Sequence, residues 1–482
     1  MTGGQPPDAL HELGALELAD ALAAGGTTST AVVGALLARM EGLEPRLHAL
    51  IATHPQALEQ AGAADERRAA GRPRSALDGV PVLVKDNIEA LGLPGSVGSL
   101  AMRDAPAQVD APVVARLRAA GLVVLGAANL SEWANFRGLR SPSGWSAMGG
   151  LVDNPWQAGH SAGGSSSGSG AALAAGYAPL ALGTETDGSI TCPAALCGVV
   201  GLKPTVGLLP TRGIAPIAAS QDAPGPMARS VADAAALLAV LLGQDPAVPV
   251  TAPGDRPGGP VLGAPAAWRT GDAATDACFD DACDRLRAAG IRVVEVDLPR
   301  AGAQLEDDEL TVLVHEVADD LDAYLRRRPG LGPASLAALV AFNAAHAEVE
   351  LAHFGQEYLE RALASGGRAA PAYATARART LAWAVGGTLA PAFGLGIDAL
   401  VAPAYGPAWP SRLDGGDAFS GGALTTAPAI AGWPILTLPM GLVHGLPVGL
   451  GLVGPAHGEA ALLRVGAAVE AVVGRLAPPE LG

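Results

Sequence analysis

The segment GHSAGGSSSGSGAALAAGYAPLALGTETDGSITCPA, residues 159–194, decides the fold of this chain. Its first third is rich in Gly and Ser, a composition typical of flexible linkers. That stretch nevertheless runs directly into an Ala-rich helical sequence and a short apolar strand, which ends at the turn TETDGS. We therefore interpret residues 159–170 as a turn that presents main-chain N–H groups at the start of a helix, inside a packed core.

Short apolar runs bounded by Gly, Pro and Asn continue on both sides of that segment. Residues 79–87 (GVPVLVKDN) and 119–129 (AAGLVVLGAAN) predict two strands, with a helix over residues 112–120 between them. Three further runs predict later strands, at residues 398–406, 433–441 and 446–454. A terminal helix is expected from Glu459. Because strands and helices alternate, this pattern predicts an α/β fold with a mainly parallel sheet.

The chain is predicted to consist of a helical lead-in, residues 1–75, and one large domain, residues 76–475. Leucine and valine recur with helical spacing between residues 8 and 50, which supports the lead-in. Residues 245–260 are rich in Pro and Gly and predict a surface connection. The stretch from about 310 to 365 is strongly helical, and we interpret it as an insertion within the large domain.

Composition excludes several classes of partner and cofactor. The 482 residues carry a formal charge of −16 without a cluster of Lys and Arg, which argues against nucleic acid. No apolar run is long enough to cross a membrane, and the first residues lack the features of an export signal, so a cytoplasmic protein is expected. The four cysteines lack CxxC spacing and the histidines are scattered, so we expect neither a metal nor a cofactor.

Ser189 is the first candidate catalytic residue. It follows an apolar strand and a turn of small polar residues, and Pro193 just beyond it favours the start of a helix. A serine at such a turn is exposed beside free main-chain N–H groups. The N–H groups of Thr186, Asp187, Gly188 and Ser189 are therefore candidate oxyanion-hole donors, each contributing roughly 3 kcal/mol to transition-state stabilisation.

Lys85 is the candidate base that a serine nucleophile needs. Of the 31 basic residues only Lys85 and Lys203 are lysines, and an arginine cannot lose its proton in a protein. Burial at the end of the run VPVLV would lower the lysine pKa towards 7, at a cost of roughly 4–5 kcal/mol. His160 has no obvious carboxylate partner, and we expect both His160 and Lys203 to be structural.

With these residues in place, the sequence resembles the amidase-signature hydrolases. The motifs that carry the resemblance are the lysine of PVLVKDN, the GGSS turn, and a serine 24 residues after the first serine of that turn. The resemblance implies a large twisted mixed β-sheet flanked by helices on both faces. It also implies a triad in which Lys85 is the base, Ser165 relays the proton and Ser189 is the nucleophile, with a cis bond between Gly164 and Ser165.

The sequence is more similar still to the bacterial peptide amidases, which remove a C-terminal carboxamide. TETDGSI, SGWSAMGG and LVAFNAAHAEVELAHFGQE carry this resemblance. It implies hydrolysis of a linear amide, from a peptide or a small molecule, through an acyl-enzyme. Many family members have Arg two residues after the nucleophile, whereas this chain has Thr191, which weakens the case for an anionic substrate group there. The candidate substrate-binding residues are Trp145, Gly164, Gln221 and Asp222.

Several alternatives stay open at this stage. Carbamates (urethanes) and esters pass through a similar tetrahedral oxyanion, so the same triad could act on them, with loops 140–160 and 405–425 shaping the pocket. The stretch GSSSG fits an esterase motif with Ser166 as nucleophile, but no strand precedes it. A non-hydrolytic subunit, similar to those of amidotransferases, is a further alternative. As a hydrolase, the chain is expected to be a monomer or homodimer.

Overall fold

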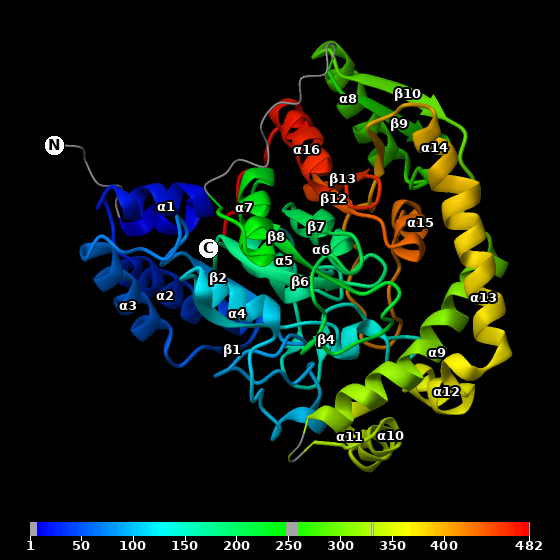
Figure 1. Ribbon diagram of the computed structural model, residues 1–482, viewed down its shortest axis with the longest axis horizontal. Coiled ribbons are helices and arrows are strands. Elements are labelled where there is room, and N and C mark those ends of the chain that lie inside the picture. The colour runs from blue at the N-terminus through cyan, green and yellow to red at the C-terminus, as the bar shows by residue number, and fades with distance from the viewer. Residues whose placement is uncertain (1–6, 247–258, 329, 331, 482) are drawn as a thin grey trace.

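The computed structural model describes residues 7–246, 259–328, 330 and 332–481, and its centre is one eleven-stranded sheet (Figure 1). In spatial order the strands are β1 (Leu50–Thr53), β3 (Val123–Ala128), β2 (Pro81–Lys85), β6 (Leu180–Glu185), β8 (Ala223–Ala228), β7 (Val200–Lys203), β12 (Ile435–Val443), β13 (Leu446–Val453), β11 (Ala399–Pro403), β9 (Val261–Pro265) and β10 (Arg292–Val296). A separate two-stranded sheet pairs β4 (Trp145–Ser146) with β5 (Gly150–Leu151).

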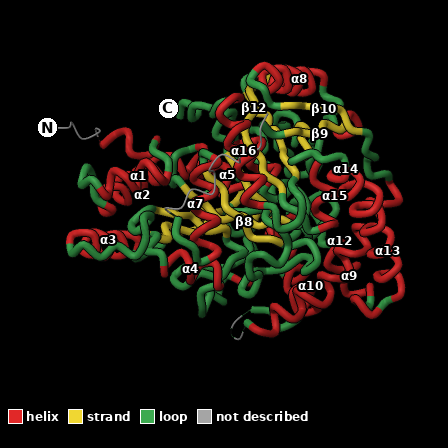
Figure 2. Tube along the Cα trace, turned by 45° about the horizontal axis from the view of Figure 1, so that its top comes forward, coloured by secondary structure: helices red, strands yellow, loops and turns green. Residues whose placement is uncertain are grey.

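Helices cover both faces of the large sheet, as Figure 2 shows. One face carries α4 (Pro112–Ala119), α7 (Val231–Leu242), α8 (Ala273–Ala288) and α16 (Glu459–Val473). The opposite face carries α5 (Ser167–Ala174) and α6 (Thr191–Cys197). The strands of the centre are apolar and buried on both sides because both faces are covered. The expected α/β fold with a sheet between helical layers is confirmed.

The prediction of a mainly parallel sheet is wrong for the middle of the sheet. Parallel pairs occur only towards its two ends, in β3–β2–β6 and in β11–β9–β10. Between them, from β6 to β11, every neighbouring pair is antiparallel. One cause is the tight turn between β12 and β13, where His444 and Gly445 both have positive φ, the combination that closes a two-residue hairpin. The mixed sheet agrees with the one implied by the family resemblance.

The N-terminal segment is helical, as its periodicity predicts. It forms α1 (Ala15–Ala23), α2 (Ser29–Leu47) and, after β1, α3 (Ala57–Ala69). The Thr28 hydroxyl caps α2 by accepting a hydrogen bond from the N–H of Ala31 at 3.1 Å. No helix in the described part of the chain is long and apolar enough to cross a membrane.

The helical insertion is longer than the predicted 310–365. It consists of α9 (Ala303–Arg327), α10 (Leu336–Ala345), α11 (Ala347–Glu350), α12 (Glu357–Ser365) and α13 (Pro371–Leu381), followed by a π-helical turn (Ala382–Leu389) and α14 (Ala390–Gly394). After β11, α15 (Ala423–Ala431) packs between this region and the sheet. The predicted surface connection, residues 245–260, lies mostly outside the described residues. The division into a lead-in and one domain stays a prediction.

A buried ion network fastens the insertion to the rest of the molecule. The Arg137 guanidinium binds Glu132 at 2.5 Å and Glu350, at the end of α11, at 3.2 Å, and all three side chains are fully buried. Arg137 also stacks on the Phe354 ring, 3.8 Å from its centroid. The network holds residues 132–137, which form one wall of the site described below.

Removing this cation should destabilise the protein strongly. Arg137→Met removes the only cation that binds the two buried carboxyl groups among the described residues, and we expect the free energy of unfolding to fall by about 3–5 kcal/mol. The exposed pair Arg287–Asp284 supplies the control, since Arg287→Met should cost less than about 1 kcal/mol. Urea unfolding of both variants measures the difference. Equal losses would mean that the buried network contributes no more than a surface pair.

Candidate active site

The site forms where neighbouring parallel strands end. Strand β2 ends at Lys85 and its partner β6 ends at Glu185, with Val84 paired to Leu182. Because parallel strands finish at the same edge of a sheet, the lysine side chain lies beside the turn that follows β6. The Gly/Ser turn before α5 completes the site from the adjoining helical face.

Lys85 is completely buried and has three hydrogen-bond partners. Its Nζ lies 2.7 Å from Ser165 Oγ, 2.9 Å from Thr184 Oγ1 and 3.3 Å from the Thr184 carbonyl oxygen. Burial lowers its pKa to about 7, although the negative charges of Glu185 and Asp222 oppose the shift. A neutral amine has two N–H groups and one lone pair. It can therefore donate twice to Thr184 and accept the proton of the Ser165 hydroxyl.

The Gly/Ser turn brings Ser165 and Ser189 into one site. The bond between Gly164 and Ser165 is cis, as the resemblance implies, and the N–H of Ser166 donates to the Ser189 carbonyl at 3.1 Å. Ser189 is 8% exposed, and it lines a cavity together with Gly164. Lys85 and Ser165 are in direct contact, whereas no hydrogen bond joins the hydroxyls of Ser165 and Ser189 in the structure.

The turn that carries Ser189 is held by Glu185, a residue that the sequence analysis missed. Its Oε2 accepts hydrogen bonds from the N–H groups of Ile190 and Thr191, both at 2.7 Å. The four N–H groups of residues 186–189 have no acceptor among the described residues. They are thus free to bind a ligand oxyanion, the role expected for them. The sequence did offer a signal for Glu185, because it is an acidic residue shortly before the helix expected near Pro193. Carboxylates are favourable near helix N-termini.

The cavity in front of Ser189 has a volume of about 200 Å³ and is mainly apolar. Its larger side chains are Phe136, Ile217, Leu313, Tyr405, Trp409 and Phe419. Asp187 and Asp417 add carboxyl groups, and no Lys, Arg or His among the described residues lines it. Such a cavity suits an apolar segment next to the carbonyl that Ser189 would attack, and it offers no cation for a free carboxylate.

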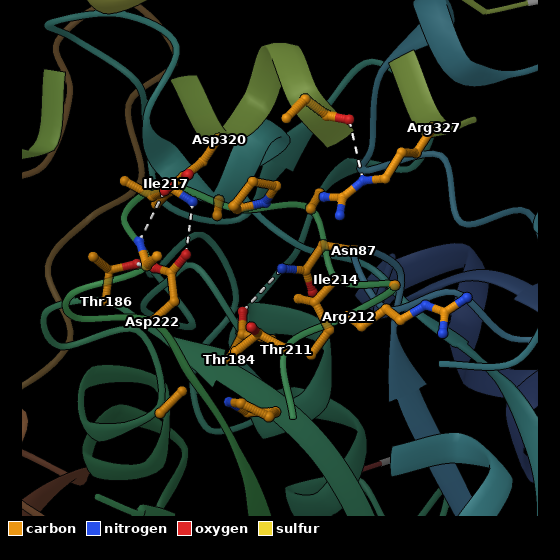
Figure 3. Close-up of a pocket in the computed structure, with 18 residues that line it drawn as sticks. Asn87, Thr184, Thr186, Thr211, Arg212, Ile214, Ile217, Asp222, Asp320 and Arg327 are labelled. Carbon is orange, nitrogen blue, oxygen red and sulfur yellow. Dashed lines mark hydrogen bonds between the residues drawn. The ribbon is translucent and has the colours of Figure 1, made fainter. Parts of the chain in front are cut away.

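A second cavity, of about 260 Å³, is lined by Thr184 and Thr186 (Figure 3). The Asn87 side chain donates to Thr184 Oγ1 at 3.0 Å and thereby orients the hydroxyl that contacts Lys85. Asp222 accepts a hydrogen bond from Thr186 Oγ1 at 2.6 Å and another from the N–H of Ile217 at 2.9 Å. Burial raises the pKa of Asp222 to about 7. Asp222 thus fastens the Ser189 turn to the loop that closes this cavity.

The remaining candidate residues lie around the site. Gln221 is fully buried and donates to Glu309 Oε1 at 2.9 Å. Trp145 packs edge-on against Phe354, outside the two cavities described above. Lys203 is fully buried, contacts the Pro204 carbonyl at 3.4 Å and has a pKa that burial lowers to about 8.

The cysteine positions suit a packed core, and most of the histidines are partly or fully exposed. The four cysteines are free, and all but Cys278 are buried. No group of three or more His, Cys, Asp or Glu side chains among the described residues is placed to hold a metal. The arrangement at Ser189 therefore consists of hydroxyls, one buried amine and main-chain N–H groups. Such a set can perform acyl transfer by proton relay.

The amidase family model matches residues 31–463, and the chain belongs to this family. It is an amidase, an enzyme that acts on amides. The peptide amidase from Stenotrophomonas maltophilia is a similar solved structure, with 44% identity, a TM-score of 0.89, and coverage of 97% of this chain and 98% of that chain. A peptide amidase in complex with the competitive inhibitor chymostatin is 45% identical, with a TM-score of 0.90 and coverage of 97% and 99%.

Relatives with a different name also match along almost the whole chain. A glutamyl-tRNA(Gln) amidotransferase subunit from Salinispora tropica is 34% identical over 503 residues, which cover 98% of this chain and 99% of that protein. The similarity to amidase-signature hydrolases and to peptide amidases, expected from the motifs, is confirmed. The chain therefore belongs to the amidase family, and the relatives that it matches are named both as peptide amidases and as amidotransferase subunits.

Proposed function

We propose that this protein hydrolyses a linear amide through an acyl-enzyme on Ser189, with Ser165 as proton relay and Lys85 as base. The observation that carries the proposal is the 2.7 Å contact between Lys85 Nζ and Ser165 Oγ, made by a fully buried lysine whose pKa lies near neutrality. Neutral lysine is a competent base. In the proposed relay a single hydroxyl, that of Ser165, connects Lys85 to the nucleophile Ser189.

The proposed reaction has two halves, formation of the acyl-enzyme and its hydrolysis. Lys85 takes the Ser165 proton as Ser165 takes the proton of Ser189, whose oxygen attacks the amide carbonyl. The N–H groups of residues 186–189 bind the resulting oxyanion. The proton then returns through Ser165 to the leaving nitrogen, and the C–N bond breaks. In the second half water attacks the acyl-enzyme, and its proton passes through the same relay to the Ser189 oxygen. The ester C–O bond then breaks, which releases the acid and restores the Ser189 hydroxyl.

The preferred substrate is a peptide C-terminal amide or another alkyl or aryl amide. The apolar cavity beside Ser189 supports it, because an amide brings no charge into a space without a cation. The greater identity to peptide amidases, 44% and 45% against 34% for the amidotransferase relative, supports the same choice. The proposed reaction requires neither a metal nor a cofactor.

Two alternatives are tested against this choice. A carbamate or ester would meet the same triad and the same oxyanion donors, so it is the first alternative. The second is an amidotransferase-like subunit, which the names of the sequence relatives favour. Against it, the cavity at Ser189 offers no cation for the carboxylate of free glutamine, and Thr191 occupies the expected Arg position, its hydroxyl donating to Glu185 at 3.2 Å.

An activity panel decides among these functions. The purified chain, which we infer to be a cytoplasmic monomer or homodimer, is assayed alone with a peptide amide, an anilide, a carbamate, an ester and glutamine. We expect ammonia from the peptide amide at the highest kcat/KM. Turnover of esters or carbamates alone would contradict the amidase assignment. Absence of all hydrolysis, together with binding of a partner protein, would establish the subunit.

The activity should rise with pH through the pKa of Lys85. The base form is the neutral amine, and burial places its pKa at about 7, so the reactive fraction falls roughly tenfold for each pH unit below that value. We therefore expect an acid limb in kcat/KM near pH 7. The measurement is kcat/KM from pH 5 to 9 at constant ionic strength. A profile that is flat down to pH 5.5 would exclude Lys85 as the titrating base.

A further inference from the structure

A third cavity, of about 320 Å³, adjoins the one in front of Ser189. The two share Asp187, Tyr405 and Phe419, so a group bound at Ser189 can extend past these side chains into the third cavity. Glu309 from α9 lines its inner part, and Glu306 and Arg300 are exposed at its rim. The described residues form no ion pair between Arg300 and these carboxylates.

The inner part of this cavity presents carboxyl oxygens that the described residues leave partly unpaired. Asp187 Oδ1 is buried and has no hydrogen-bond partner among the described residues. Glu309 is 8% exposed, and only its Oε1 is engaged, by the Gln221 amide at 2.9 Å. Gln221 itself is fully buried. A buried acceptor without a donor costs free energy, so this group of side chains favours a ligand that brings several N–H donors.

The charges that line the cavity also favour a ligand with N–H donors, and in particular a cation. Burial, and then repulsion from Asp187, raises the pKa of Glu309. Burial, and then the charge of Glu185, raises the pKa of Asp187. A cation between the two carboxyl groups would relieve both effects. The rings of Tyr405 and Phe419, with centroids 5.8 Å apart and planes inclined at 67°, add aromatic faces that attract cations.

We propose that the third cavity binds an ammonium or guanidinium group on the acyl part of the substrate, so that the enzyme prefers amides with a basic side chain. This inference rests on the proposed function, because it assigns the acyl group of that reaction. Asp187 and Glu309 supply the acceptors, and the aromatic pair covers the alkyl stem of the side chain. Gln221 lies outside the cavity and orients Glu309 through its amide. The same carboxylates would repel a substrate with an acidic side chain.

The test compares substrates that differ only in the charged group. Nα-acetyl-lysinamide is paired with Nα-acetyl-norleucinamide, and acetyl-Lys-Ala-amide with acetyl-Nle-Ala-amide, so that a basic residue at either position is detected. We expect kcat/KM to be at least tenfold higher for the lysine member of one pair. Glu309→Gln should reduce that ratio at least fivefold, because one of the two inner carboxyl groups is lost.

Asp307→Asn is the matched control. Asp307 is on the same helix, exposed and outside the cavity, so its replacement should leave the lysine-to-norleucine ratio unchanged. Because the readout is a ratio, a general loss of activity does not affect it. Hydrolysis of all four amides without preference, or a preference that survives Glu309→Gln, would overturn the inference and leave the amidase function intact. Failure to hydrolyse any of them would count against the proposed function itself.

Discussion

Ser189→Ala is expected to lower kcat/KM for amide hydrolysis by at least about 10⁴-fold, because removal of a nucleophile abolishes the acyl-enzyme route. The replacement removes one hydroxyl of a residue that is 8% exposed, so the fold should be retained. The measurement is ammonia release from a peptide amide, with circular dichroism as a check on folding. Residual activity within tenfold of the unmodified enzyme would contradict the assignment of Ser189.

Ser166→Ala is the matched control for that prediction. The Ser166 hydroxyl donates to the Thr184 carbonyl at 3.1 Å and accepts from the Thr184 N–H at 3.3 Å, so it is engaged in holding the strand end. We expect its loss to reduce kcat/KM far less than the loss of Ser189. The esterase alternative requires the opposite order, since it makes Ser166 the nucleophile. Comparing the two variants therefore tests both hypotheses.

Lys85→Arg should be nearly as inactive as Lys85→Ala, with kcat/KM lower by about 10³-fold or more in each. An arginine keeps the positive charge, but its guanidinium stays protonated at any working pH and cannot take the Ser165 proton. The acid limb near pH 7 should disappear together with the activity in both variants. If Lys85→Arg retained substantial activity, the lysine would act by its charge and not as a base.

Lys203→Met controls for burial of a lysine. Lys203 is as deeply buried as Lys85, yet among the described residues its amine hydrogen-bonds only to the Pro204 carbonyl. We expect Lys203→Met to change kcat/KM by less than tenfold and to keep the acid limb near pH 7. Thermal unfolding of each variant separates lost chemistry from lost stability.

The catalytic candidates were predictable because local sequence constrains each of them. Lys85 ends an apolar strand and is one of two lysines, and Ser189 sits in a turn between a strand and a helix. Thr184 was missed because its importance depends on how β2 and β6 pair, whereas Glu185 acts locally on the N–H groups of Ile190 and Thr191. Only that pairing brings Thr184 within 2.9 Å of Lys85 Nζ.

The errors in the fold have equally local causes. Strand β8 reads APGPMA, and its two prolines disguise a central strand, so the antiparallel centre of the sheet was not expected. The insertion was cut short because the glycine pair at 366–367 and Pro371 suggest a loop over residues 365–371, although Pro371 begins α13 at a position that helices tolerate. The Arg137 network joins residues 213 positions apart, and no periodicity indicates such a contact.

Covalent labelling of the nucleophile tests the central claim most directly. The enzyme is inactivated with a fluorophosphonate, digested, and the modified peptide is located by tandem mass spectrometry. We predict one covalent adduct on Ser189, and no adduct in the Lys85→Ala variant under the same conditions. An adduct on Ser166, or an adduct on Ser189 that forms equally fast without Lys85, would contradict the proposed triad.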